Sequence, residues 1–131
     1  MKKKILIVSA EYYPEISEPL KISAIDNLKN FDVKVLVAPG VFEIPFIISN
    51  NIKKYHAFLA LGCVIKGETP HFELISSAVM NGIIKLSIES KKPIGNAILT
   101  CLNQDQALAR SKKGKEAAEA LKAVLKNANN K

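Results

Sequence analysis

The chain has 131 residues, of which 48% are hydrophobic and 24% charged, and its formal net charge at pH 7 is +7. This length suits one domain with a sizeable core, so we predict that residues 1–131 form a single domain. The composition excludes a disordered chain. No apolar run approaches the roughly 20 residues that a membrane-spanning helix requires, so we expect no membrane partner.

The positive charge lies at the two ends of the chain. Lys2–Lys4 and residues 110–131 carry the excess, whereas residues 5–109 sum to −1. No nucleic-acid motif with interleaved aromatic residues accompanies it, so we expect no nucleic-acid partner. The apolar stretch after the N-terminal lysines is too short for a signal peptide. The two cysteines lack metal-ligand spacing, so we expect a cytoplasmic protein with reduced, core-lining thiols and no metal.

Predicted strands and helices alternate in the first half of the chain. A β-branched run over Lys4–Ser9 predicts a buried strand, and the apolar stripe that starts at Ile16 predicts an amphipathic helix after it. Val33–Ala38 predicts a second strand, covered on both faces like the first. A short helix follows, starting near Phe42 or Glu43. The first helical stripe consists of Ile16, Leu20, Ala24 and Leu28.

The same alternation continues to the C-terminus. Phe58–Ile65 and the weaker run Ile94–Leu99 predict the third and fourth strands. A long helix lies between them, a short one covers Gln104–Ser111, and a last helix ends the chain. The apolar stripes of the two long helices consist of Phe72, Ile75, Val79, Ile83 and Leu86, and of Ala117, Leu121, Val124 and Leu125.

This alternation implies right-handed crossovers between parallel strands. We therefore predict an α/β fold, a three-layer sandwich with a four-stranded parallel sheet, similar to flavodoxin. Ligands of such open sheets bind beyond the carboxyl ends of the strands. The site is therefore expected in the loops at residues 10–15, 39–43, 65–71 and 100–103.

The segment 62–73 combines a strand end, a turn and a helix start. Gly67 permits a tight turn, Thr69 is a good N-cap, and Pro70 suits the first helical position. The free N–H groups of this turn and the positive end of the helix predict a phosphate site. His71 falls beside it. Because a helix N-terminus disfavours imidazolium, we interpret His71 as a general base and not as a structural histidine.

Other residues of these loops have both a structural and a functional interpretation. Glu43 could accept hydrogen bonds from sugar hydroxyls, or only complement a helix dipole. Tyr12 and Tyr13 could stack on a heterocycle or pack as ordinary amphipathic residues. Arg110 could bind phosphate bidentately or remain a solvated helix-end charge. The residues alone thus predict an α/β domain with an anion site and a candidate histidine base, but no substrate.

Three motifs carry a resemblance to a known family: PGVFEIP at 39–45, ALGCVIKGETPHFE at 60–73 and LT-x-x-x-x-x-QA-x-x-R at 99–110. Together they resemble the lumazine synthase family over nearly the whole chain. The resemblance implies a transferase of riboflavin biosynthesis, which condenses 5-amino-6-(D-ribitylamino)uracil with 3,4-dihydroxy-2-butanone 4-phosphate. The products are 6,7-dimethyl-8-ribityllumazine, phosphate and water. No metal or redox cofactor is implied.

The resemblance also implies roles for individual residues. His71 takes the place of the family's proton-transfer histidine. Glu68, Thr69 and Arg110 match the residues that hold the phosphate. The matches for the pyrimidine and its ribityl chain are Val41, Phe42 and Glu43 in one loop, Cys63, Val64 and Ile65 at a strand end, Tyr12 as a stacking ring, and Asn96 as a hydrogen-bonding amide.

The sequence departs from the family at several positions. Ala10–Tyr13 replaces a loop that usually contains Arg-Phe and introduces Glu11, while Lys66 replaces a common arginine. Asn96 stands where an aromatic residue is frequent, and Lys113 matches a family lysine only across a shortened segment. These departures motivate an alternative, a non-catalytic flavin- or lumazine-binding relative of the same fold. A receiver-like signalling domain is disfavoured, because no aspartate follows the third strand.

The family assembles as pentamers or multiples of pentamers, with active sites between subunits. The resemblance therefore implies at least a pentamer here, with small-molecule substrates as the other partners. We expect Tyr12, Phe42 and Asn96 to meet Arg110 and His71 across the subunit interface.

Overall fold

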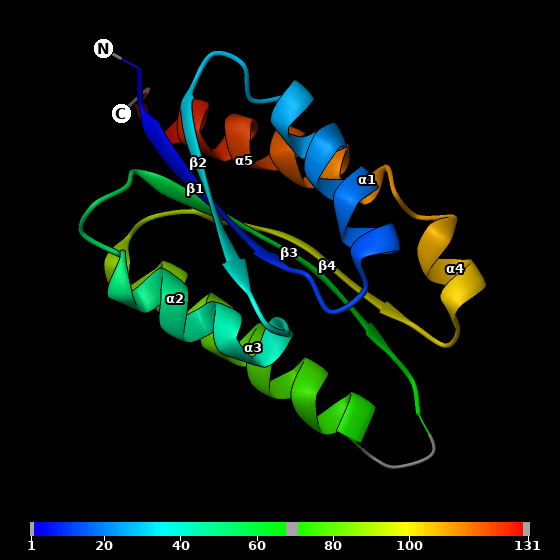
Figure 1. Ribbon diagram of the computed structural model, residues 1–131. Coiled ribbons are helices and arrows are strands. Elements are labelled where there is room, and N and C mark those ends of the chain that lie inside the picture. Colours follow the sequence, from blue (N-terminus) through cyan, green and yellow to red (C-terminus); the bar gives the residue numbers. More distant parts are fainter. Residues whose placement is uncertain (1, 68–70, 130–131) are drawn as a thin grey trace.

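The structure is a computed structural model that describes residues 2–67 and 71–129. Parallel strands form one sheet between two layers of helices (Figure 1), which confirms the predicted α/β fold with a four-stranded parallel sheet. The elements are β1 (Lys4–Ala10), α1 (Pro14–Asp26), β2 (Asp32–Ala38), the 3₁₀ turn η1 (Val41–Glu43), α2 (Ile44–Asn50), β3 (Ala57–Ile65), α3 (His71–Ser90), β4 (Ile94–Cys101), α4 (Gln104–Leu108) and α5 (Lys113–Asn129).

The sheet has the strand order β2-β1-β3-β4, so β1 and β3 are central and β2 and β4 are edges. Ile7 of β1 lies opposite Val35 of β2 and Leu59 of β3. Successive side chains of a strand point to opposite faces, and β1 is apolar on both. Ile5 and Ile7 therefore enter one core cluster, and Leu6 and Val8 enter the other.

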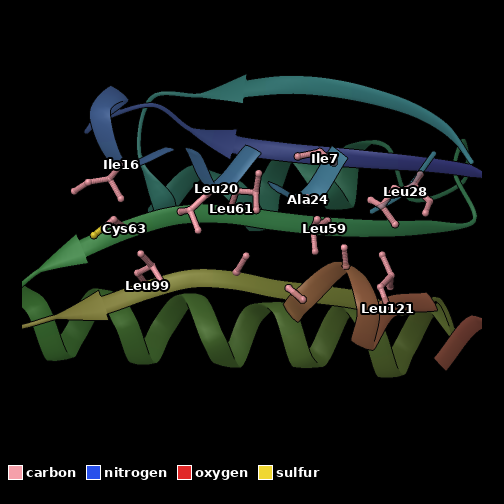
Figure 2. Packing of buried hydrophobic residues seen from close by; sticks show 14 of the residues in the cluster. Ile7, Ile16, Leu20, Ala24, Leu28, Leu59, Leu61, Cys63, Leu99 and Leu121 are labelled. Carbon is pink, nitrogen blue, oxygen red and sulfur yellow. The ribbon is translucent and has the colours of Figure 1, made fainter. Parts of the chain in front are cut away.

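Each face of the sheet has its own helical layer. Helices α1, α4 and α5 contribute to the cluster on one face, and η1, α2 and α3 to the cluster on the other (Figure 1). Figure 2 shows the first cluster, in which Leu20 and Ala24 of α1 and Leu121 of α5 gather around Leu59 and Leu61 of β3. Both faces of the central strands β1 and β3 are thus covered, as expected for a parallel sheet.

Three sequence expectations need correction. The second strand is not covered on both faces: Val37 of β2 is 60% exposed, because this strand lies at the sheet edge. The helix predicted over Gln104–Ser111 ends at Leu108, and the backbone then forms a turn in which Arg110 N–H donates to Ala107 O (3.1 Å). Val124 is 51% exposed, because it lines the groove along the open edge of β4.

The turn that carries Arg110 is held by the packing of α5 on α1. At Gly114, in the first turn of α5, an added Cβ would lie 2.5 Å from Ser23 Oγ of α1. Only glycine allows this close approach. Ser23 Oγ also donates a hydrogen bond to Ser111 O (3.2 Å). Residues 109–112 are therefore fixed between two packed helices. Within the described ranges, no helix combines the length and apolar character needed to cross a membrane.

Candidate functional site

Two cavities hold most of the predicted site residues. The first, called here the aromatic cavity, has a volume of about 280 Å³ and lies where β1, β2 and β3 end. The second, the cationic cavity, has about 490 Å³ and lies beside β4 and the turn after α4. Among the described residues, the two share no lining residue. The aromatic cavity is lined by Tyr12, Tyr13, Gly40, Val41, Phe42, Cys63, Val64, Ile65 and Ile75, and the cationic cavity by Met80, Asn96, Ile98, Leu99, Thr100, Ala109, Arg110, Lys112, Lys113 and Glu116.

Two exposed rings stand at the aromatic cavity. Tyr12 is 69% and Phe42 62% exposed, although both are large and partly apolar. Tyr12 meets the ring of Tyr13 edge to face, at 4.9 Å between centroids. Tyr13 itself packs against the core, where burial raises the pKa of its hydroxyl. The Tyr12 ring is therefore supported from behind and leaves a face for a planar ligand.

The backbone of β3 is open towards the aromatic cavity. Pairing of β3 with β1 stops at Leu61, whereas pairing with β4 continues to Ile65. The edge of residues 63–65 that would face β1 therefore has no strand beside it. Backbone N–H and C=O groups in this position suit a planar heterocycle that carries donors and acceptors along one side.

Gly62 brings the loop after β2 close to this strand end. An added Cβ at Gly62 would lie 2.7 Å from Val41 Cγ1 and 3.0 Å from Ala10 Cβ. A glycine is therefore required for η1 to pack here. Gly67, by contrast, has no positive φ, and an added Cβ would meet nothing within 4 Å, so the tight turn expected there does not require glycine.

Glu11, which directly precedes Tyr12 in the loop after β1, has defined partners. Its carboxylate accepts a hydrogen bond from the buried Ser9 hydroxyl (2.5 Å) and lies 3.6 Å from Lys21 Nζ of α1. Its backbone N–H donates to Ala38 O (3.1 Å). Lys21 is therefore the ion-pair partner of the unusual acid, and the network fixes the start of the loop that carries Tyr12.

His71 is the first residue of α3 and is exposed to solvent. One helical turn further, Ile75 lines the aromatic cavity, and residues four apart lie on one face of a helix. His71 is thus on the aromatic-cavity side of α3, with Tyr12 and Phe42, and not with Arg110 as the sequence predicted. Glu68 and Thr69, which the sequence predicts to bind phosphate and to cap the helix, lie outside the described residues. Lys66 Nζ lies 3.9 Å from Glu73 Oε1 in an exposed ion pair.

The cationic cavity contains Arg110, Lys112 and Lys113, all from the turn after α4 and the start of α5. Arg110 Nη1 donates to the buried Cys101 Sγ at 3.8 Å. Three neighbouring cations make this cavity suitable for an anion. Glu116 of α5 is the acidic residue that lines it.

The amide of Asn96 is engaged within the chain. Its Oδ1 accepts the N–H of Ile98 (2.9 Å), and its Nδ2 donates to Met80 Sδ (3.2 Å). Asn96 thereby caps a backbone donor of the edge strand β4. One amide hydrogen and one oxygen lone pair remain for a ligand.

Two predicted site residues do not lie beside the neighbours that were expected for them. Asn96 was expected to lie with Tyr12 and Phe42, but it lines the cationic cavity with Arg110. The reason is that β4 is the edge strand on the far side of β3. Glu43 is exposed and does not line the aromatic cavity, because its carboxylate turns back towards Gly40.

Several cavity residues were not among the predicted site residues. Ile75 was expected only as part of an apolar core stripe. No local sequence motif indicated Met80, Lys112 or Glu116. Thr100 belongs to the third motif and could have been chosen from it. Within the described part of the chain, no group of three or more metal-ligating side chains is present.

The two thiols are in contact at the ends of β3 and β4. Cys63 is buried, and burial together with a hydrogen bond to Cys101 raises the pKa of Cys63 to about 12. Cys63 thus stays a neutral thiol at neutral pH, as expected for a core-lining cysteine.

Comparison with known sequences decides the family. A sequence profile described as 6,7-dimethyl-8-ribityllumazine synthase matches residues 2–131. The chain belongs to the lumazine synthase family. Lumazine synthases are transferases of riboflavin biosynthesis, so this finding confirms the enzyme class that the three motifs implied.

Individual lumazine synthases resemble the chain over most of its length. The 6,7-dimethyl-8-ribityllumazine synthase 1 of Rhodopseudomonas palustris is 39% identical over 137 residues, covering 94% of this chain and 84% of the relative. The enzyme of Bartonella bacilliformis is also 39% identical, with 86% and 78% covered. That of Corynebacterium kroppenstedtii is 36% identical, with 82% and 69% covered.

Proposed function

We propose that this chain forms 6,7-dimethyl-8-ribityllumazine from 5-amino-6-(D-ribitylamino)uracil and 3,4-dihydroxy-2-butanone 4-phosphate. The amine of the pyrimidine attacks the ketone to give an imine with loss of water, phosphate is eliminated, and the second ring closes with loss of another water. Both the ring of the first substrate and the phosphate of the second need dedicated binding groups. The aromatic and cationic cavities are the candidates.

The observation that carries this proposal is the open edge of β3 in the aromatic cavity. The uracil edge pairs with the backbone of residues 63–65, where no neighbouring strand competes. Tyr12 stacks on its face, and Val41 and Phe42 contact the ring. Glu43, which lies outside the cavity at the end of the same loop, accepts hydrogen bonds from the ribityl chain. Backbone groups held in a sheet keep their geometry, so the pyrimidine is oriented without further ordering of the protein.

The sugar phosphate is bound by Arg110 together with the turn at Glu68 and Thr69. Arg110 presents a planar fork that matches phosphate oxygens. Asn96 donates its remaining amide hydrogen to the substrate ring. His71 transfers protons during imine formation and phosphate loss. Much of the rate enhancement comes from holding two reactants in register.

The active form is a pentamer or a multiple of pentamers in the cytoplasm. The proposal is supported by the positions of the two cavities, because among the described residues one lies at the ends of β1, β2 and β3 and the other beside β4, so that one chain offers two separate binding surfaces. A neighbouring copy would complete each site. Size-exclusion chromatography with light scattering tests the assembly, and a monomer at micromolar concentration would contradict it.

The decisive experiment mixes the full chain with both substrates and follows the lumazine chromophore. Product formation at a rate proportional to enzyme supports the proposal. Tight binding of riboflavin or the lumazine, with no product from the two substrates, would instead support the non-catalytic relative.

Arg110→Ala tests the phosphate assignment. Loss of charge-assisted hydrogen bonds is expected to raise the KM for the sugar phosphate roughly tenfold or more, with the KM for the pyrimidine unchanged. Lys115→Ala is the matched control, because it removes a positive charge from α5 that pairs with Glu119 and does not line the cavity. An unchanged KM for the sugar phosphate in Arg110→Ala would show that the assignment is wrong.

A further inference from the structure

The side chain of Arg110 rests on a rigid acceptor. Cys101 is 2% exposed and ends β4, where its backbone pairs with β3: Lys66 N–H donates to Cys101 O at 2.9 Å. The side chain of Cys63 lies in the same buried core cluster and interacts with Cys101. The sulfur that receives Arg110 Nη1 is thus fixed by the sheet and by a second buried side chain.

Arg110 itself lies on an exposed turn, where a long side chain would otherwise sample many rotamers. Fixing such a side chain costs free energy when a ligand binds. A sulfur acceptor restrains the guanidinium through one N–H and leaves most of its donors available. A carboxylate partner would compete with phosphate, and among the described residues Arg110 makes no ion pair.

We propose that Cys101 is a positioning residue for Arg110: its buried sulfur orients the guanidinium so that the cationic cavity is preorganised for the substrate phosphate. This inference rests on the proposed role of Arg110. Cys101 does not touch the substrate, and it acts only through the arginine. It therefore affects binding of the phosphate-bearing substrate and not the chemical steps.

The test compares Cys101→Ala with Cys101→Ser under reducing conditions. The two variants have nearly equal volume, so they share any loss of packing, but only serine keeps an acceptor. Cys101→Ala is expected to raise the KM for the sugar phosphate about threefold to tenfold, with kcat and the KM for the pyrimidine unchanged. Cys101→Ser should restore most of the affinity. Thermal unfolding of each variant establishes that the assays use folded protein.

A double-mutant cycle separates this inference from the proposed function. In an Arg110→Ala background, Cys101→Ala should have no further effect on the KM for the sugar phosphate. If Arg110→Ala raises that KM but Cys101→Ala does not, or if the two effects simply add, the positioning role is refuted while the role of Arg110 stands. If Arg110→Ala itself has no effect, the phosphate assignment fails, and the positioning role fails with it.

Discussion

At the scale of single residues, His71 and Arg110 perform separable tasks in the proposed reaction. His71 stands at the start of α3, on the same helix face as Ile75 of the aromatic cavity. Arg110 belongs to the other cavity. A proton-transfer group lowers the barrier of the chemical steps, whereas a phosphate ligand lowers the free energy of the bound substrate. Substitutions of the two residues should therefore change different kinetic constants.

His71→Ala is expected to lower kcat by about 10²-fold and by no more than roughly 10⁴-fold, because the positioning of both reactants survives. Both KM values should change little. His56→Ala is the matched control, since His56 precedes β3 at the opposite end of the sheet, where its Nδ1 accepts Lys4 N–H (2.9 Å). Steady-state kinetics with the lumazine chromophore measures both. An unaltered kcat in His71→Ala would contradict the role of this histidine.

Cys63 makes the free energy of unfolding decrease with rising pH in the alkaline range. Burial and the neighbouring Cys101 raise the pKa of Cys63 from 9.0 to about 12. Between these values the unfolded chain has released the thiol proton and the folded chain still holds it. The contribution to the free energy of unfolding is thus complete below pH 9 and declines as pH rises towards 12.

Urea denaturation of the wild-type chain and of Cys63→Ala across this range checks the expectation. All other groups are the same in both proteins. The difference between their free energies of unfolding therefore reports on the Cys63 thiol. The stability advantage of the wild type should shrink as pH rises. A difference that stays constant would show that the Cys63 thiol is not perturbed.

At the scale of elements, the approach of η1 to β3 determines the shape of the aromatic cavity. Gly62→Ala would place a methyl group 2.7 Å from Val41 Cγ1. We expect a loss of about 1–3 kcal/mol in the free energy of unfolding from this overpacking, together with a higher KM for the pyrimidine. Gly67→Ala meets nothing within 4 Å and should change the stability by less than about 0.5 kcal/mol. Urea denaturation compares the two variants, and equal losses would contradict the packing argument.

The elements that the sequence predicts well are those with contiguous apolar runs. All four strands begin and end within two residues of their expected positions, because buried parallel strands read as continuous β-branched segments. The exposure of Val37 was not predictable from such a run, since it depends on which strand lies at the edge. Likewise, α4 ends early because the chain must turn to bring α5 onto α1, a tertiary requirement with no local signal.

The candidate site also has a part that the sequence predicts and a part that depends on tertiary structure. Local motifs place Tyr12, Val41 and Phe42 together with the strand end at residues 63–65, because the loops that follow neighbouring parallel strands meet at one edge of a sheet. The pairing of Asn96 with Arg110 depends on β4 being the other edge strand. The contact between Arg110 and Cys101 depends on the turn after α4, and Cys101 was expected only as a core residue.

At the scale of the whole molecule, the two cavities of one chain lie along different parts of the sheet. One is at the ends of β1, β2 and β3, and the other lies beside β4. In a ring of identical chains joined head to tail, the aromatic cavity of each chain would face the cationic cavity of its neighbour. This arrangement predicts complementation between defective subunits.

The complementation experiment uses Arg110→Ala, with an intact aromatic cavity, and Phe42→Ala, with an intact cationic cavity. Each variant alone should have low activity at limiting substrate. When the two are unfolded, mixed equally and refolded together, about a quarter of the interfaces should contain two intact cavities. Activity should recover to a corresponding fraction of the wild type. No recovery, although mixed assemblies form, would mean that each site is built within one chain.

The open edge of β3 and the cation-rich turn after α4 have a consequence for how the assembly responds to its ligands. In the proposed assembly, a molecule that touches both surfaces would bridge two chains, so it would bind the assembled state and not the separated subunits. By linkage, any such ligand must increase the affinity between subunits by the same factor by which subunit association increases the affinity for the ligand. A bisubstrate analogue with a phosphate would therefore stabilise the proposed assembly against dissociation into single subunits.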